Sequence, residues 1–186
     1  MVEVVKWEDA IPMLLQGRGD VLAGVNDTPE RRRVVHFTAQ LLPAKNVVVT
    51  RLPGAPIGSE RELRSARVAV VPETTWAEAV LRAGVPASHI EKVDDVPAAL
   101  AALKAGRATA AVMDIIDYLH QRRRDPELQL GPTLGSALSG AWAVRKSDPE
   151  LQESLDAFLV GFRKSAAWSR LLVRYSGDDA PTVLGR

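Results

Sequence analysis

Segments with strand character and segments with helical spacing of apolar residues alternate along the chain, and this alternation is what most limits its fold. The predicted strands are residues 2–5, 21–24, 45–50, 67–71, 90–93, 109–113 and 138–144. The predicted helices are residues 8–16, 29–33, 75–82, 96–105, 114–123 and 166–175, with a long helix that opens at residues 147–150. A chain that alternates in this way forms an α/β sheet covered by helices.

The segment 51–59, RLPGAPIGS, is the clearest linker because it holds two prolines and two glycines. The chain becomes extended again near residue 140. Together these features predict two lobes, residues 1–50 with 139–186 and an inserted lobe at 51–138. Two crossings between lobes make a hinge, and hinged lobes commonly close around a ligand.

The composition is that of an ordinary globular protein and excludes several function classes. Net charge is +1, from 24 basic and 23 acidic residues, so we expect no nucleic-acid partner. The absence of cysteine excludes disulfides and thiolate metal sites. The three histidines lack the spacing of metal ligands, and we expect neither a metal nor a cofactor. No apolar run approaches the ~20 residues that span a bilayer.

The stretch from Gly19 to Arg31 carries the most distinctive chemistry. An apolar run is followed by a polar turn, a proline and an arginine. This order places backbone groups, the Asn26 amide and the Arg31 guanidinium beside the carboxyl end of a strand, where open α/β sheets bind small ligands. A guanidinium matches a carboxylate with two parallel hydrogen bonds. The stretch therefore predicts a site for a small carboxylate.

Several motifs in order resemble one family across the whole chain. They are WEDAIPMLLQGRGD at 7–20, DTPER at 27–31, FT at 37–38, RVAVVPETT at 67–75, ALKAGR at 102–107, AAVMD at 110–114 and AVRKSDPE at 143–150. They resemble the polar amino-acid-binding class of bacterial extracellular solute-binding proteins, the receptors of ABC importers. The resemblance implies a two-lobed periplasmic-binding-protein-like fold of type II.

The resemblance implies that an amino acid, or a similar small zwitterion, binds in the cleft between the lobes. The ligand-binding residues that it implies are Trp7, Gly24, Asn26, Arg31, Thr74, Thr75 and Asp114. Arg31 would bind the α-carboxylate with support from the backbone near Gly24 and Asn26, and Thr75 would add a hydroxyl and an N–H at a helix start. Asp114 would accept the α-ammonium, and Trp7 would form an apolar wall.

Each of these residues also has a purely structural interpretation. Arg31 lies in a run with Arg32 and Arg33, and such charge runs usually form a solvated face. Thr74, Thr75 and Asp114 stand where helices begin and are good capping residues. Trp7 has the apolar character of a core residue.

The chain departs from the family pattern in three places. Glu73 stands where the family usually has glycine, and residues 39–41 replace an Asp-Pro-Tyr that supplies a polar contact near the hinge. Family members also begin with a strand and a helix ahead of the position of Val2. We therefore expect an incomplete first lobe, and self-association through its exposed strand edge.

By resemblance, the partners are the membrane permease of an ABC transporter and the solute, and the location is periplasmic or extracellular. The start of the chain lacks the regions of a signal peptide. Two alternatives stay open. One is an enzyme similar to cyclohexadienyl (prephenate/arogenate) dehydratases, with Asp117 as its acid. The other is a sensory or regulatory module of a larger receptor or lytic transglycosylase.

Overall fold

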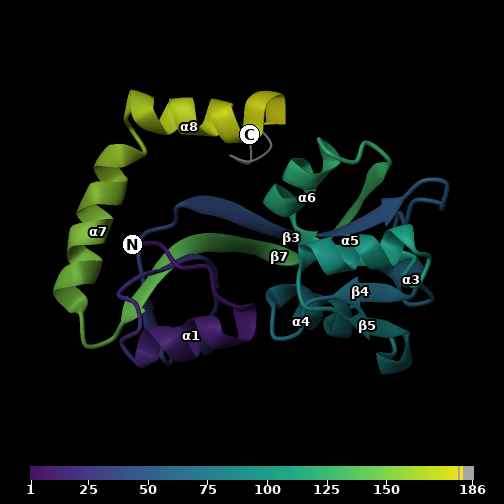
Figure 1. The fold of residues 1–186 in the computed structure, drawn as a ribbon, viewed down its shortest axis with the longest axis horizontal. Helices are drawn as coiled ribbons and strands as arrows, with labels where there is room; N and C mark the ends of the chain where they lie inside the picture. The colour runs from purple at the N-terminus through teal and green to yellow at the C-terminus, as the bar shows by residue number, and fades with distance from the viewer. Residues whose placement is uncertain (180, 182–186) are drawn as a thin grey trace. The chain divides into compact units, whose positions relative to one another are not determined.

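The computed structural model describes residues 1–179 and 181, and its contacts divide the chain into two compact units (Figure 1). The first unit is Met1–Pro43 with Leu138–Arg186, and the second is Ala44–Ala137. The first unit boundary falls inside a strand, so the segment 51–59 lies within the second unit. The sequence analysis predicted two lobes that move about a hinge. These units are defined by contacts alone, so the two lobes and their boundaries stay a prediction.

The first unit is built on a small antiparallel sheet. The elements that lie wholly in it are α1 (Trp7–Leu15), β1 (Leu22–Asp27), α2 (Pro29–Arg32), β2 (Val35–Phe37), α7 (Pro149–Phe162), α8 (Ala166–Ser176) and η2 (Gly177–Asp179). Both β1 and β2 pair with the last part of β7 (Leu128–Arg145), where Ala143 is opposite Leu22 and Phe37. Leu14 of α1 packs with Val25 into the core of this unit.

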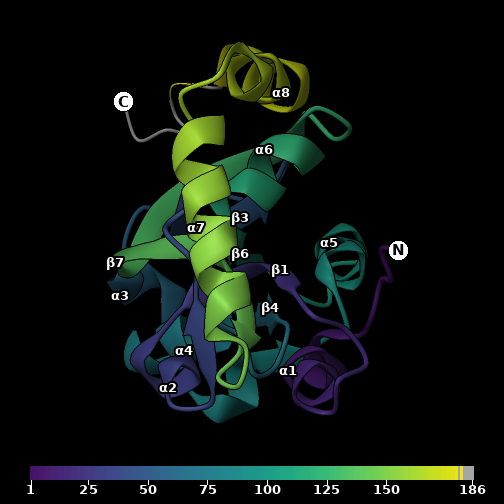
Figure 2. The same ribbon diagram turned by 90° about the vertical axis from the view of Figure 1, so that its left-hand side faces the viewer.

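The C-terminal helices turn a corner within the first unit. Both views show α8 leaving the end of α7 in a new direction (Figures 1 and 2). The Phe162 ring stacks on Phe158 at 5.2 Å between centroids and meets Trp168 edge-on at 5.6 Å. Ser165 caps α8 by accepting a hydrogen bond from the Trp168 N–H. The corner is therefore fixed by an aromatic cluster and a helix cap.

The second unit is a mixed sheet with helices. Its elements are β3 (Leu42–Arg51), α3 (Glu60–Leu63), β4 (Val68–Val70), α4 (Thr75–Arg82), η1 (Ala87–His89), β5 (Ile90–Lys92), α5 (Val96–Lys104), β6 (Ala110–Asp114) and α6 (Ile115–Arg122). The strand β4 is parallel to β5 and β6, and β3 runs antiparallel to β6. Val48, Val68 and Val112 are fully buried in its core.

The parallel pair β4 and β6 sets where polar groups can gather in the second unit. The carboxyl ends of parallel strands meet at one edge of a sheet. Four residues separate the end of β4 from the start of α4, and α6 begins directly after β6. The first turns of both helices are thereby brought to the same edge.

The predicted α/β class and type II architecture are confirmed, but several elements differ from the prediction. The predicted strand 138–144 covers only the second part of β7, and the sequence analysis missed β2 and α3. The predicted strand at residues 2–5 is wrong, because residues 1–6 form no strand and Val2 and Val4 are 95% and 96% exposed. A strand needs a neighbour for its backbone groups, which an apolar run alone does not supply. Among the described residues, no helix is both long and apolar enough to cross a membrane.

Candidate functional site

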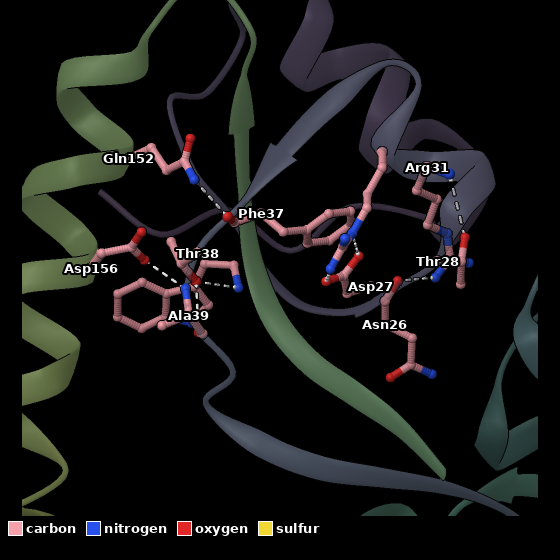
Figure 3. Close-up of polar contacts among 11 residues, drawn as sticks. Asn26, Asp27, Thr28, Arg31, Phe37, Thr38, Ala39, Gln152 and Asp156 are labelled. Carbon is pink, nitrogen blue, oxygen red and sulfur yellow. Dashed lines mark hydrogen bonds and ion pairs between the residues drawn. The ribbon is translucent and has the colours of Figure 1, made fainter. Parts of the chain in front are cut away.

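Arg31 is held by the turn that carries it. Thr28 caps α2, its hydroxyl accepting a hydrogen bond from the Arg31 N–H at 3.3 Å, and Pro29 occupies the first turn. The Arg31 Nη1 donates to the carbonyl oxygen of Asn26 at 2.8 Å (Figure 3). The guanidinium lies 4.9 Å from the centroid of the Trp7 ring. The strand end and the indole thus fix the direction of this cation.

The three consecutive arginines have different surroundings. Arg32 is exposed and pairs with both carboxylate oxygens of Asp27, at 2.6 and 2.5 Å. Arg33 is exposed as well, whereas Arg31 is partly buried. The solvated-face interpretation therefore describes Arg32 and Arg33, and Arg31 is set apart from both by its contact with Trp7.

Gly24 lies where β1 is irregular. The register of β1 against β7 shifts between Leu22 and Val25, and Gly24 has a φ of +72°. This left-handed conformation favours glycine over residues with a Cβ. The bulge precedes Asn26, so it sets the direction in which the Asn26 carbonyl points toward Arg31.

The first turn of α4 is closed by its own threonines. The Thr74 hydroxyl donates to the Val71 carbonyl at 2.7 Å and accepts from the Ala77 N–H at 3.2 Å. Thr75 is buried, and its hydroxyl donates to the side-chain oxygen of Asn46 at 3.2 Å. The Asn46 amide nitrogen donates to the Thr75 carbonyl, also at 3.2 Å. Thr74 is thus the N-cap, and Thr75 is joined to β3.

Glu73 has an unusual backbone in the turn ahead of these threonines. Its φ is 59°, and it is the one residue other than glycine with a positive φ in the part of the chain that the structure describes. The conformation follows from the turn from Val71 to Thr74, which has proline second and a left-handed residue third. Glycine fits such a position best, so Glu73 carries backbone strain here.

Asp114 ends β6 and caps α6. Its Oδ1 accepts a hydrogen bond from the Ile116 N–H at 2.9 Å, and the Lys45 N–H also donates to this carboxylate. Burial, with a smaller contribution from the charge of Asp117, nevertheless raises the pKa of Asp114 to about 6. Burial also raises the pKa of Asp117, which the charge of His120 partly offsets. Two carboxyl groups therefore share the first turn of α6.

The structure brings the predicted residues together in two groups. Trp7, Asn26 and Arg31 are in contact within the first unit, and Gly24 shapes the strand beside them. Thr75 and Asp114 both lie beside Asn46 of β3 in the second unit. Thr75 bonds the Asn46 side chain, and Asp114 is opposite Asn46 in the β3–β6 register. Asn46 was missed by the sequence analysis, although a lone amide ahead of three valines is the signal that could have found it.

The segment before β3 is bonded by α7. Gln152 Nε2 donates to the Phe37 carbonyl at 2.9 Å, and Asp156 Oδ1 accepts from the Ala39 N–H at 2.5 Å (Figure 3). Thr38 exchanges backbone and hydroxyl hydrogen bonds with Trp142 of β7. The Asp156 carboxylate of α7 thus bonds the segment in which residues 39–41 stand in place of the family's Asp-Pro-Tyr.

No group of three or more His, Asp or Glu side chains that could hold a metal ion occurs among the described residues. The two groups of residues offer one fixed cation and one partly buried carboxyl group.

The fold matches that of solved type II periplasmic binding proteins. A mutant of ArgBP from T. maritima has 27% identity and a TM-score of 0.86, with 94% of this chain and 76% of that chain covered. An ancestral arginine-binding protein bound to glutamine has 27% identity and a TM-score of 0.84, with 94% and 79% covered.

A third structure shows the same fold at lower identity. It is an ancestral amino acid-binding protein, a precursor of cyclohexadienyl dehydratase, with 23% identity, a TM-score of 0.83, and 94% and 76% of the two chains covered. The comparison with curated protein sequences gave no match.

These likenesses define the class as solute-binding proteins of the type II fold. Residues 1–178 match the family of bacterial extracellular solute-binding proteins, family 3, and the chain belongs to this family. The resemblance drawn from the motifs is thereby confirmed, and the family is one of binding proteins rather than enzymes.

Proposed function

We propose that the protein binds a free amino acid, or a similar small zwitterion, and presents it to the membrane permease of an ABC importer. The observation that carries the proposal is the Arg31 guanidinium, which lies over Trp7 and donates to the Asn26 carbonyl. Its planar fork matches an α-carboxylate with two parallel hydrogen bonds. In this proposal Trp7 is the apolar wall, and the backbone at Gly24 and Asn26 supports the carboxylate.

The α-ammonium is assigned to Asp114. Its carboxylate accepts hydrogen bonds from the Ile116 and Lys45 N–H groups and is partly buried, so its orientation is fixed. An ammonium beside it would compensate a charge that the protein alone stabilises poorly. Thr74 and Thr75 complete the proposed site at the start of α4, where backbone N–H groups favour an anion.

Arginine and glutamine are the first solutes to try, because the similar proteins are described as arginine-binding or glutamine-bound. The ABC permease partner follows from membership of the family. In this role the protein works in the periplasm or outside the cell, and it does no chemistry of its own.

A thermal-shift screen against the twenty amino acids tests the proposal. A ligand at 100 times its Kd stabilises a protein by about 2.7 kcal/mol, which raises Tm by several degrees in a chain of this size. We expect one class of amino acids to raise Tm. The decarboxylated and N-acetylated forms of the strongest ligand should lose most of that shift. Equal shifts from these analogues would show that the two charged groups of the zwitterion are not recognised.

The raised pKa of Asp117 favours an enzymatic alternative. A raised pKa is what a general acid needs in order to protonate a leaving hydroxyl. Incubation with prephenate decides between the two functions. We expect no turnover, whereas turnover that is lost in Asp117→Asn would establish the dehydratase function instead.

A further inference from the structure

Trp7 opens α1 and is held by the core of the first unit. It is partly buried and packs against the buried cluster that contains Leu14, Val25 and Val35. An indole turns about only two side-chain bonds, so contact with a densely packed core leaves its ring little freedom. The ring is therefore a fixed surface at the start of α1.

The Arg31 guanidinium lies over this surface. Its carbon atom is 4.9 Å from the centroid of the Trp7 ring, inside the distance of about 6 Å at which a cation is attracted to an aromatic face. Nη1 of the same side chain donates to the Asn26 carbonyl at 2.8 Å (Figure 3). Two contacts of different kinds, one with a ring and one with a carbonyl oxygen, thus hold the guanidinium.

The pair of Trp7 and Arg31 differs from the other cation–ring pairs in the part of the chain that the structure describes. Those pairs are local in sequence, and their distances to the ring centroid are longer: Arg122 with Tyr118 at 6.0 Å, and Arg174 with Tyr175 at 5.6 Å. Trp7 and Arg31 instead join α1 to α2. Helix geometry does not bring these two residues together, so their contact is a product of the fold of the first unit.

A guanidinium that is held before the ligand arrives binds a carboxylate better than a mobile one. Arginine has one of the largest side-chain entropies, and an arginine that is ordered only on binding loses that freedom at the expense of affinity. Contacts that hold Arg31 in the free protein therefore raise the affinity for a ligand carboxylate. The gain does not depend on the ligand side chain, because the carboxylate is common to all amino acids.

We propose that Trp7 is a positioning residue for Arg31: the indole contributes to affinity chiefly by holding the guanidinium, and only to a lesser extent as a wall against the ligand side chain. This inference rests on the proposed function, in which Arg31 binds the ligand carboxylate. The two roles of Trp7 differ in what they predict. A wall contributes differently to ligands with different side chains, whereas a positioning residue contributes equally to all of them.

Titration calorimetry of Trp7→Leu and Trp7→Phe with L-arginine and with L-glutamine tests the proposal. Leucine keeps an apolar side chain without a ring, whereas phenylalanine keeps an aromatic face for the cation. We expect Trp7→Leu to bind about fivefold or more weakly, with losses for the two ligands that agree within about twofold. Trp7→Phe should bind within about twofold of the parent. Equal losses in the two variants, or a loss confined to one ligand, would overturn the proposal.

A double-mutant cycle over Trp7 and Arg31 measures their contact without any ligand. The proteins are the parent, Trp7→Leu, Arg31→Ala and the double variant, and the measurement is unfolding in urea. Changes to residues in contact are not additive, so the double variant should lose less stability than the two single losses combined. Additive losses would show that the ring does not hold the guanidinium, and would also overturn the proposal.

Trp168→Leu is the matched control. Trp168 is another partly buried tryptophan of the first unit, and its ring meets that of Phe162 edge-on at 5.6 Å. The same chemical change there should lower stability and leave the affinity within about twofold of the parent. An equal loss of affinity in this control would show that any weakening of the first unit impairs binding, which contradicts a specific role for Trp7.

The two measurements separate this inference from the proposed function. A parent protein that binds no amino acid overturns the proposed function, and the ligand part of the inference with it. The unfolding cycle still decides whether Trp7 holds Arg31, because it needs no ligand.

Discussion

At the scale of single residues, Asp114 combines a helix cap with a partly buried charge, and the two roles depend differently on pH. The cap bond to the Ile116 N–H favours the ionised form, whereas burial and Asp117 favour the protonated form. Burial prevails, and the pKa is raised from 3.8 to about 6. The residue therefore stabilises the fold less at neutral pH than in mild acid.

Asp114→Asn should raise the free energy of unfolding at pH 7 and weaken ligand binding. A raised pKa means that protonation favours the folded state. The contribution of Asp114 to stability is therefore fully present below about pH 3.8 and lost as pH rises through 6. Asparagine caps helices as well as aspartate does and removes the charge, so the gain is up to about 3 kcal/mol. Urea unfolding at pH 7 and pH 4 measures it, and the gain should shrink at pH 4.

Asp95→Asn is the control for this prediction. Asp95 caps α5 by accepting from the Ala98 N–H at 2.7 Å, but its side chain is exposed. The same chemical change there should alter stability by less than about 0.5 kcal/mol. A loss of stability in Asp114→Asn at pH 7 would mean that the hydrogen bonds of the ionised form outweigh its burial.

Glu73 gives a second prediction at this scale. Glycine adopts a φ near 59° without strain, whereas other L-residues pay about 1–2 kcal/mol. After allowing for the greater freedom of glycine in the unfolded chain, Glu73→Gly should raise the free energy of unfolding by about 0.5–1 kcal/mol. Thermal unfolding measures this difference, with Glu60→Gly in α3 expected to lower stability by a similar amount. A less stable Glu73→Gly would show that the contacts of the Glu73 side chain outweigh its backbone strain.

At the scale of elements, α7 acts as a brace for the segment that leads into β3. Gln152 and Asp156 are four residues apart and so share a face of the helix. They bond the backbone of Phe37 and Ala39, and Arg163 at the end of the helix donates to the Gln40 carbonyl at 2.7 Å. One helix thus satisfies backbone groups of three residues along the segment that joins β2 to β3.

Asp156→Ala should lower the free energy of unfolding by about 1–3 kcal/mol, because it leaves the partly buried Ala39 N–H without its charged acceptor. Glu153→Ala is the matched control, since Glu153 is an exposed carboxylate of the same helix, and it should change stability by less than about 0.5 kcal/mol. Chemical denaturation of both variants gives the comparison. Equal effects would assign the loss to helix charge rather than to the Ala39 contact.

At the scale of the whole molecule, the sequence predicted the structural features that depend on residues close together in the chain. It missed the features that depend on residues far apart in the chain. The caps at Thr74 and Asp114 and the proline that opens α7 are local signals, and all three helices begin where those signals place them. Strand partners are not local. The run at Val2–Val5 has strand character without a partner, and the first part of β7 is a strand that its composition does not reveal.

The same distinction applies to the candidate site. Arg31 and Asn26 are five residues apart, so their contact follows from one strand, one turn and one short helix. The Trp7 contact and the bond between Asn46 and Thr75 join elements far apart in the sequence. The residues of the proposed site come from motifs and stay a prediction, whereas the contacts that position them required the structure.

The most direct test of the central claim is a calorimetric titration of L-arginine and L-glutamine into the parent, Arg31→Ala and Arg33→Ala. Both variants remove one positive charge, but Arg33 is exposed, whereas Arg31 lies over Trp7. Loss of the partner of a bound carboxylate costs about 2–5 kcal/mol, so Arg31→Ala should bind roughly 30-fold or more weakly. Arg33→Ala should bind like the parent. Equal affinities for the parent and Arg31→Ala would contradict the assignment of the ligand carboxylate to Arg31.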